Sequence, residues 1–502
     1  MHFDLECTFT LSKPVEARDD VEAFLASFVQ EANDDLLQRG ARDCGADITD
    51  WTLHYDRVDM RIVSTGNIRS HEGALRIKKA LAQQLGQQFH IGVRDLLLRR
   101  YVITMELDPS PVHAITIPFA ELSIDGATAQ MVIEDRDESF LRNNYVDRMV
   151  NLVQEKSSLQ HYEGKKEYWE QLWRSPEKEP IWRRDPSEEM QERGWITLGE
   201  TKGKWFYYPP AAAVMRTLER LAIEEVVTPL GFKETIEPMH VSLDTWLSTG
   251  HLEGMPQEMY YTCEPATRDT EAWERFIDLV KITREVPTEE LQRNLKSVRA
   301  GVCYAQCPNM YAAMAGKTIA DSSLPILLFD RSVPSNRYES GGRHGIERVD
   351  EFHRIEILYI GTKEHLLELR EQLMERYRHV FNEVLDLEWR MARVAPFYLQ
   401  QAGIHDEAQA DQGTIDFEVW LPYRGDRDHD WLEIQNISIV GDKYTEAFNI
   451  KGQTADLWSG CSGIGLERWM VAFLAQKGLD PAEWPDDFKQ YLPELPGMPE
   501  FL

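Results

Sequence analysis

The sequence predicts an α+β fold of antiparallel sheets flanked by helices, and three observations support this class. Apolar residues near the N-terminus alternate strictly, as in a strand with one buried face: Phe3, Leu5, Cys7, Phe9 and Leu11. The apolar spacing then changes to i, i+3, i+4, i+7 over residues 21–36, which indicates an amphipathic helix that stops near Gly40. From about residue 194, strands rich in isoleucine, valine, phenylalanine and tyrosine are separated by helices.

The remaining elements follow the same two patterns. Further strands are expected over 50–63, 92–106 and 113–134, and further helices over 70–89 and 138–156. These elements form an N-terminal α+β domain, residues 1–163. A stretch rich in tryptophan, lysine and glutamate with weak periodicity is the expected linker, residues 164–194. The larger domain covers 195–502 and carries a charged helical insertion at about 264–300.

Length and composition describe a globular chain without membrane spans. A length of 502 residues is enough for roughly three domains and a large core. Of these residues, 42% are hydrophobic and 28% are charged. No stretch reaches about 18 uninterrupted apolar residues, and the acidic N-terminus differs from a basic secretory signal. We therefore expect a cytoplasmic protein with no membrane partner.

Charge and cysteine usage narrow the range of partners. The formal net charge of -30 repels polyanions at long range, so nucleic-acid binding requires a local basic patch. The N-terminal domain concentrates basic side chains, which either bind a phosphate backbone or form a solvated surface: Arg39, Arg69, Arg76, Lys78, Lys79, Arg94, Arg99 and Arg100. The six cysteines are too sparse for a disulfide scaffold.

Three segments of the larger domain contain residue types suited to chemistry. Residues 218–238 have the pattern of a helix, a glycine stop, a strand and Pro238, which alone is a common arrangement. Residues 329–357 place arginines, an acid and Phe352 on two strands joined by a glycine-rich loop, which can bind a nucleotide or form a surface hairpin with exchanged ion pairs. Residues 458–469 contain three glycines before a helix, like a phosphate cradle, although neither the Walker nor the dinucleotide spacing fits.

In this order the three segments resemble motifs 1, 2 and 3 of the class II aminoacyl-tRNA synthetases. The details are most similar to the methanogenic archaeal type of seryl-tRNA synthetase, over essentially the whole chain. Three stretches carry the resemblance: Arg337 to Gly342, His344 to Glu356, and Leu457 to Gly463. It implies a catalytic antiparallel sheet, an N-terminal tRNA-binding domain and a homodimer formed through motif 1. It also implies ATP-dependent activation of L-serine to seryl-adenylate and transfer to the 3′ end of serine tRNA, with selenocysteine tRNA as a further acceptor.

The resemblance also assigns an ATP site. Arg337 is expected to hold the α-phosphate, and Phe352 and Arg468 to sandwich the adenine. Glu339 is expected to contact the adenine amine or the acceptor end, Arg348 to neutralise pyrophosphate, and Glu433 to hold Mg²⁺. The full set is Arg337, Glu339, Arg348, Val349, Phe352, Glu433 and Arg468, with Arg337 and Arg468 as the catalytic residues. No general base is required, because the serine carboxylate is already ionised and attacks in line.

A zinc site is implied at Cys307, Glu356 and Cys461, with one ion per subunit. The spacing of these residues is not diagnostic, and two core cysteines with a strand glutamate are the structural alternative. Three protein ligands leave one tetrahedral position open, which in the resembled family binds the amino group of serine. Cys303 is a rival ligand, and the resemblance favours Cys307 through the adjacent Pro308.

The same resemblance places four residues at the serine substrate: Ala305, Arg354, Gln401 and Asn436. A loop over 397–401 is expected to close on serine. A pocket closed behind the serine hydroxyl disfavours threonine, although one methylene is worth only about 1–3 kcal/mol.

For tRNA, the resemblance favours the compact N-terminal domain, with contacts from Arg39, Arg76, Lys78 and Lys79. The sequence has no sustained heptads of the kind that form a coiled-coil arm. We therefore expect this domain to recognise the shape and backbone of the long variable arm of serine tRNA. Two other functions stay open from the sequence. One is a ligase that loads an amino acid onto a carrier protein, and the other is a non-catalytic tRNA-binding paralogue; charging assays and pyrophosphate exchange distinguish them.

Overall fold

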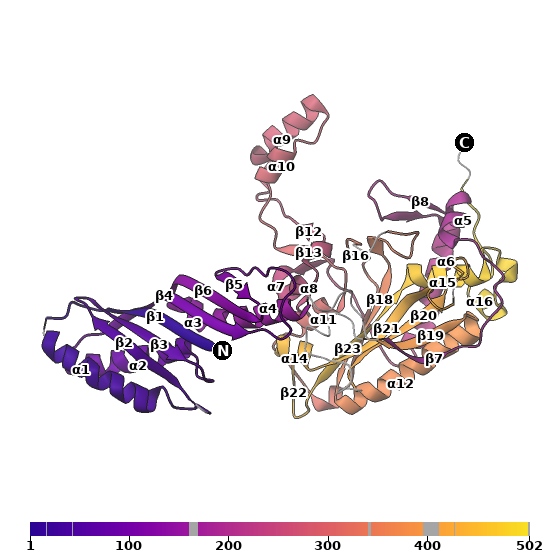
Figure 1. Ribbon diagram of the computed structural model, residues 1–502. Helices are drawn as coiled ribbons and strands as arrows, with labels where there is room; N and C mark the ends of the chain where they lie inside the picture. The colour runs from indigo at the N-terminus through magenta and orange to yellow at the C-terminus, as the bar shows by residue number, and fades with distance from the viewer. Residues whose placement is uncertain are drawn as a thin grey trace. The chain divides into compact units, whose positions relative to one another are not determined.

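The computed structural model describes residues 1–16, 18–42, 44–159, 169–339, 343–394, 411–425 and 427–499. The chain forms two compact units, Met1–Lys166 and Glu167–Leu502 (Figure 1). Each unit combines antiparallel strands with helices, so the predicted α+β class is confirmed. Among the described residues, no helix has the length and hydropathy needed to cross a membrane.

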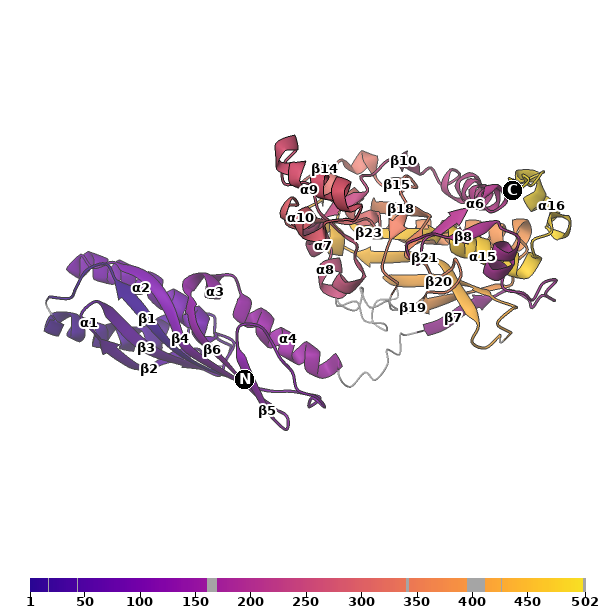
Figure 2. The ribbon, with the colours of Figure 1, turned by 90° about the horizontal axis from the view of Figure 1, so that it is seen from above.

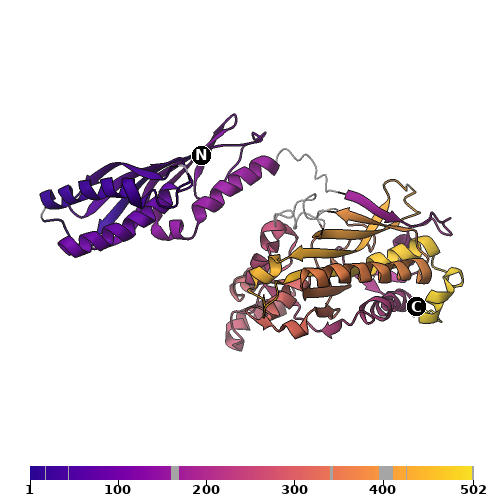
Figure 3. The ribbon, with the colours of Figure 1, turned by 90° about the horizontal axis from the view of Figure 1, so that it is seen from below.

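The first unit contains a six-stranded antiparallel sheet in the order β2-β3-β1-β4-β6-β5. Its strands are β1 (His2–Leu11), β2 (Ala46–Leu53), β3 (Arg57–Ser64), β4 (Val93–Glu106), β5 (Glu121–Asp125) and β6 (Thr128–Asp137). Its helices are α1 (Arg18–Glu31), α2 (Ser70–Phe89), α3 (Glu138–Arg142) and α4 (Tyr145–Leu159). Figure 3 shows the long helices lying along the sheet. The alternating apolar residues of β1 are all buried in the core between sheet and helices, as their spacing predicts.

Two sequence predictions need correction in detail. The strand expected over 50–63 is a hairpin of β2 and β3, and the strand expected over 113–134 is the hairpin of β5 and β6, which begins only at Glu121. The two turns lie at residues 54–56 and 126–127 and are only two or three residues long, so the strand-like pattern on either side of each was interpreted as one strand.

The segment predicted as a linker, 164–194, contributes regular structure to the second unit. It contains β7 (Trp169–Arg174) and α5 (Pro186–Glu192), and β7 pairs antiparallel with β19 (Trp389–Val394). The ring of Trp173 packs against Trp389, with centroids 4.6 Å apart. The periodicity is weak because β7 is an edge strand whose first four side chains are exposed.

The second unit contains an eight-stranded sheet in the order β10-β15-β18-β23-β21-β20-β19-β7, part of which Figure 2 shows from above. Its other strands are β10 (Lys233–Thr235), β15 (Ile326–Asp330), β18 (Arg354–Gly361), β20 (Gly413–Trp420), β21 (Trp431–Gly441) and β23 (Trp458–Gly465). In this sheet β10 and β15 pair in parallel, and the remaining neighbours are antiparallel.

Helices cover both faces of the central strands. On one face, α12 (Lys363–His379) and α15 (Leu466–Lys477) pack over a core that includes Ile357 and Tyr359 of β18. On the other face, α7 (Leu243–Ser248) and α11 (Cys307–Ala313) pack over a core that includes Leu358 and Ile360. Because side chains alternate along a strand, Glu356 points to the α11 side.

The helical insertion predicted at about 264–300 contains α9 (Thr270–Thr283) and α10 (Thr288–Arg293). The helices are separated at Val286 and Pro287, and Figure 1 shows them projecting away from the sheet of their unit.

Candidate functional site

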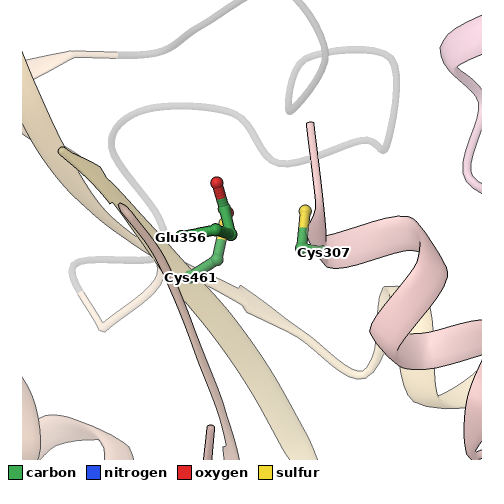
Figure 4. Close-up of side chains that lie close together, drawn as sticks. All are labelled: Cys307, Glu356 and Cys461. Atoms are coloured by element: carbon green, nitrogen blue, oxygen red, sulfur yellow. The ribbon is translucent and has the colours of Figure 1, made fainter. Parts of the chain in front are cut away.

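Cys307, Glu356 and Cys461 converge on the α11 side of the large sheet, and we call these three residues the metal triad. Their candidate ligand atoms all lie within 4.8 Å of one another. Glu356 on β18 and Cys461 on β23 are diagonal neighbours on one face, because Glu356 pairs with Gly463 and Leu358 with Cys461. Cys307, in the first turn of α11, faces them across the gap (Figure 4).

Cys307 and Glu356 are buried and Cys461 is half-buried, so negative charge on these side chains is unfavourable unless a positive charge lies nearby. A hydrogen bond to Cys461, burial and neighbouring negative charge raise the pKa of the Cys307 thiol well above its ordinary value. Burial also raises the pKa of Glu356, against the opposing charge of Arg354. Neither carboxylate oxygen of Glu356 has a hydrogen-bond partner of good geometry among the described residues. Two thiolates and a carboxylate at such separations are a donor set suited to Zn²⁺.

Arg354 connects the triad to the rest of the site. Its guanidinium Nη2 lies 2.5 Å from Glu356 Oε2, and its side chain is only 19% exposed. Space for it comes from Gly463, where an added Cβ atom would lie 2.2 Å from Arg354 Nη2. The backbone N–H of Gly463 donates to Asn436 Oδ1 at 3.4 Å. The three glycines of this segment lie within β23, directly before α15, and Gly463 leaves room for the Arg354 side chain.

Arg337, the arginine predicted to bind the α-phosphate, lies in a different part of the chain from the triad. Arg337 follows β16 (Ser335–Asn336), which pairs with β17 (Glu351–Phe352). Its Nε lies 2.6 Å from Glu258 Oε2, and its side chain is 37% exposed. Exposure of that size leaves the guanidinium accessible to an anion, which would compete with Glu258 for it.

Asp350 anchors the loop that follows Arg337. Its buried carboxylate accepts two hydrogen bonds from Arg343, at 2.9 and 2.7 Å, and one from the Tyr260 hydroxyl at 2.5 Å. Burial raises the pKa of Asp350, but these hydrogen bonds outweigh it and hold the pKa below its ordinary value. An ionised Asp350 therefore connects Arg343 with Tyr260, and its backbone carbonyl accepts the N–H of Arg337 at 2.8 Å.

Glu467 joins the strand of motif 2 to the helix of motif 3. Its buried carboxylate accepts hydrogen bonds from His353 N at 2.8 and 3.0 Å and lies 2.8 Å from His353 Nδ1. The flanking residues are Phe352 and Arg468, the pair expected to sandwich adenine. Arg468 Nη1 lies 3.0 Å from Glu433 Oε2, so the residue expected to hold Mg²⁺ is paired with this arginine.

The contact between Glu467 and His353 can be tested by the pH dependence of stability in a Glu467→Gln variant. Burial lowers the pKa of His353, but the pairing with Glu467 outweighs burial and raises the pKa above 6.5. The pair therefore contributes its full stability below pH 6.5, and this contribution is lost as pH rises through the raised pKa. We expect Glu467→Gln to lower the free energy of unfolding by about 1–3 kcal/mol at acidic pH and by less in alkali. Thermal unfolding at pH 5.5 and 9 measures this.

The matched control for that prediction is Glu351→Gln. Glu351 pairs with Lys204 at 3.3 Å on a more exposed surface, so little change is expected at either pH. An equal loss for Glu467→Gln at both pH values would contradict the proposed ion pair.

The other predicted site residues are distributed as follows. Arg348 is exposed and Val349 is buried, and Glu339 N–H donates to Asp350 Oδ1 at 3.1 Å. Ala305 is buried two residues before Cys307. Gln401 and the whole loop over 397–401 lie outside the described residues. Cys303 is buried and its Sγ donates to Ala305 O at 3.1 Å, and it does not belong to the group of ligand atoms found within 4.8 Å.

The predicted tRNA contacts lie around α2 in the first unit. Lys79 is exposed, whereas Lys78 pairs with Glu138 and donates to Arg94 O at 2.9 Å. Arg76 donates to Arg39 O at 2.8 Å, and Arg39 pairs with Asp35. The basic side chains are therefore not equally available to phosphate.

Sequence reasoning did not assign roles to Glu258, Asp350 and Glu467. Asp350 and Glu467 lie inside the recognised motif segments, directly beside assigned residues, and that position is a usable signal. Glu258 has no sequence signal, because only the fold brings it to Arg337.

Comparisons with known proteins agree with this geometry. A tRNA-binding domain family matches residues 1–155. The type-2 serine–tRNA ligases of Methanococcoides burtonii and Methanothrix thermoacetophila are each 42% identical to this chain, with full coverage of both sequences. Among solved structures, M. kandleri SerRS in complex with A. aeolicus tRNASec is 32% identical with a TM-score of 0.83, covering 100% of this chain and 99% of that chain.

Proposed function

This chain belongs to the type-2 serine–tRNA ligases, and on that premise we propose that Cys307, Glu356 and Cys461 hold a zinc ion that receives the amino group of serine. The family membership confirms the resemblance predicted from the three motifs. The protein is a class II aminoacyl-tRNA synthetase that activates L-serine with ATP and charges serine tRNA. The observation that carries the zinc proposal is the convergence of three distant ligands within 4.8 Å.

The chain's own residues supply the setting for adenylate formation. Bound zinc would supply a Lewis acid that fixes the serine amine. The α-phosphate of ATP displaces Glu258 from Arg337, and Arg337 then holds this phosphate. Arg354 and Asn436 contact the serine beside the triad. The ionised serine carboxylate forms a bond to the α-phosphorus while the bond to the pyrophosphate oxygen breaks. Arg348 and Arg468 neutralise the departing charge, and Glu433 would hold Mg²⁺, which would supply further positive charge at the phosphates.

The test is serine-dependent exchange of pyrophosphate into ATP, together with metal analysis of the purified protein. Exchange with serine and about one zinc per chain are expected. Exchange at full rate in a metal-free sample would refute the zinc proposal and leave the ligase assignment intact.

The first unit is the proposed docking site for tRNA, with serine tRNA as the acceptor. The match of residues 1–155 to a tRNA-binding domain family supports tRNA rather than a carrier protein. The relative solved in complex with tRNASec supports selenocysteine tRNA as a further acceptor. A homodimer formed through motif 1 and a cytoplasmic location stay predictions.

Lys79 and Lys78 give a matched comparison for the tRNA site. Lys79→Ala is expected to weaken tRNA binding more than Lys78→Ala, because Glu138 already neutralises the ammonium of Lys78. Loss of one phosphate contact lowers the slope of log K against log salt by about 0.7–0.9. Filter binding at several salt concentrations measures the slope, and serine-dependent exchange serves as the control for both variants. A larger effect of Lys78→Ala in a folded protein would contradict the assignment.

A further inference from the structure

Tyr304 lies next to the proposed serine site and has a buried hydroxyl group with no function assigned so far. The residue is only 6% exposed, and its hydroxyl finds no hydrogen-bond partner in the described part of the chain. Its ring stacks on the indole of Trp246, with centroids 4.9 Å apart and 8° between the planes. His251 packs edge-on against both rings. Packing on these sides fixes the ring and with it the hydroxyl.

Backbone contacts locate the segment that carries this tyrosine between the phosphate-binding arginine and the metal triad. Asn336, which directly precedes Arg337, donates its N–H to Cys303 O at 2.8 Å. Cys307 begins α11 three residues after Tyr304. Burial raises the pKa of the Tyr304 hydroxyl, and Arg337 leads the charges that oppose the rise. The segment thus runs from the neighbour of the phosphate-binding arginine to the metal triad.

A buried hydroxyl without a partner is unfavourable, and phenylalanine would fill the same space without that cost. The same segment carries Ala305, one of the residues expected at the serine substrate. A substrate with its amine at the triad and its carboxylate near Arg337 would bring anionic oxygens into this region. Such oxygens are strong acceptors for a phenolic O–H.

We propose that Tyr304 is a further substrate-binding residue, whose hydroxyl donates a hydrogen bond to a carboxylate oxygen of serine before attack and to the acyl carbonyl or an α-phosphate oxygen of seryl-adenylate after it. This inference rests on the proposed function, because it requires the serine amine at the metal triad and the α-phosphate at Arg337. It assigns to Tyr304 the orientation of the serine carboxylate for attack.

Tyr304→Phe tests the proposal, because it keeps the ring and removes only the hydroxyl. In serine-dependent pyrophosphate exchange, the KM for serine is expected to rise about 10- to 100-fold, as for a hydrogen bond to a charged group. The KM for ATP is expected to change by less than about threefold, since ATP keeps its other contacts. The Kd of a non-hydrolysable sulfamoyl analogue of seryl-adenylate is expected to rise in parallel. The Tm is expected to stay constant or to rise.

The matched control is Tyr101→Phe in the first unit. Tyr101 is fully buried and its hydroxyl lies 3.0 Å from His71 Nδ1, so its loss is expected to lower the Tm without changing the serine KM. Unchanged serine KM and analogue Kd for Tyr304→Phe would overturn the inference, whether or not the Tm falls. Absence of serine-dependent exchange in the unaltered protein would instead refute the proposed function, so the two failures are distinct.

Discussion

Replacement of Cys461 by alanine is expected to lower serine-dependent pyrophosphate exchange by at least roughly 1,000-fold, while ATP binding stays measurable. The triad then retains two ligands, and two ligands cannot hold zinc in the tetrahedral geometry that leaves one position for the serine amine. Arg337 lies on another segment, and Arg468 lies on α15, which follows the strand of Cys461 and is held by Glu433, so the positions of both are expected to persist. Metal analysis, exchange kinetics and ATP binding on one preparation measure all three quantities.

The matched control is Cys303→Ala, which also tests the rival ligand. Cys303 is fully buried but lies outside the triad, and its thiol is engaged by Ala305 O. Zinc content near that of the unaltered protein is expected. Zinc retained by Cys461→Ala but lost by Cys303→Ala would show that the ligands are wrongly assigned.

The same site predicts a pH dependence of zinc binding. Thiols and carboxylates bind metal only when deprotonated, so protons compete with zinc. The surroundings raise the pKa of both Cys307 and Glu356, which strengthens this competition. We therefore expect zinc content and serine-dependent pyrophosphate exchange to fall together as the pH is lowered. Metal analysis and exchange kinetics measure the two quantities.

Local patterns predict elements whose own residues determine them. The helix expected over 70–89 matches α2 in both bounds, because its apolar spacing is regular and Glu72 accepts from the Arg69 backbone N–H at its start. The strand β1 is equally local. By contrast, β7 becomes a strand only through its pairing with β19 and the packing of Trp173 on Trp389, which no local pattern records.

The candidate site shows the same division between local and long-range determinants. The three motif segments carry recognisable residue orders, so the family could be predicted from them. The ligand set could not be predicted from spacing, because α11, β18 and β23 meet only in the folded sheet. The contact of Arg337 with Glu258 and the passage of Arg354 across Gly463 also depend on tertiary structure.

Gly463→Ala is expected to lower kcat/KM for serine by about 100-fold and to lower the Tm. The added methyl carbon would lie 2.2, 2.6 and 2.7 Å from the Nη2, Cζ and Nε atoms of Arg354, so the whole guanidinium must move. Overpacking of this kind costs about 1–3 kcal/mol. Movement of Arg354 also removes the positive charge beside Glu356. This charge is shared by the triad and the serine site. Exchange kinetics at varied serine and a thermal melt measure both effects.

Two further variants separate this mechanism from a general effect on β23. Gly465→Ala places its methyl on the same strand with nearest atoms at 3.6 and 3.8 Å, which is ordinary contact, so a much smaller loss of serine activation is expected. In an Arg354→Ala background, Gly463→Ala is expected to add almost nothing, because the group it displaces is already absent. Additive losses in that double variant would show that the methyl group acts elsewhere than on Arg354, and that the guanidinium is not what Gly463 accommodates.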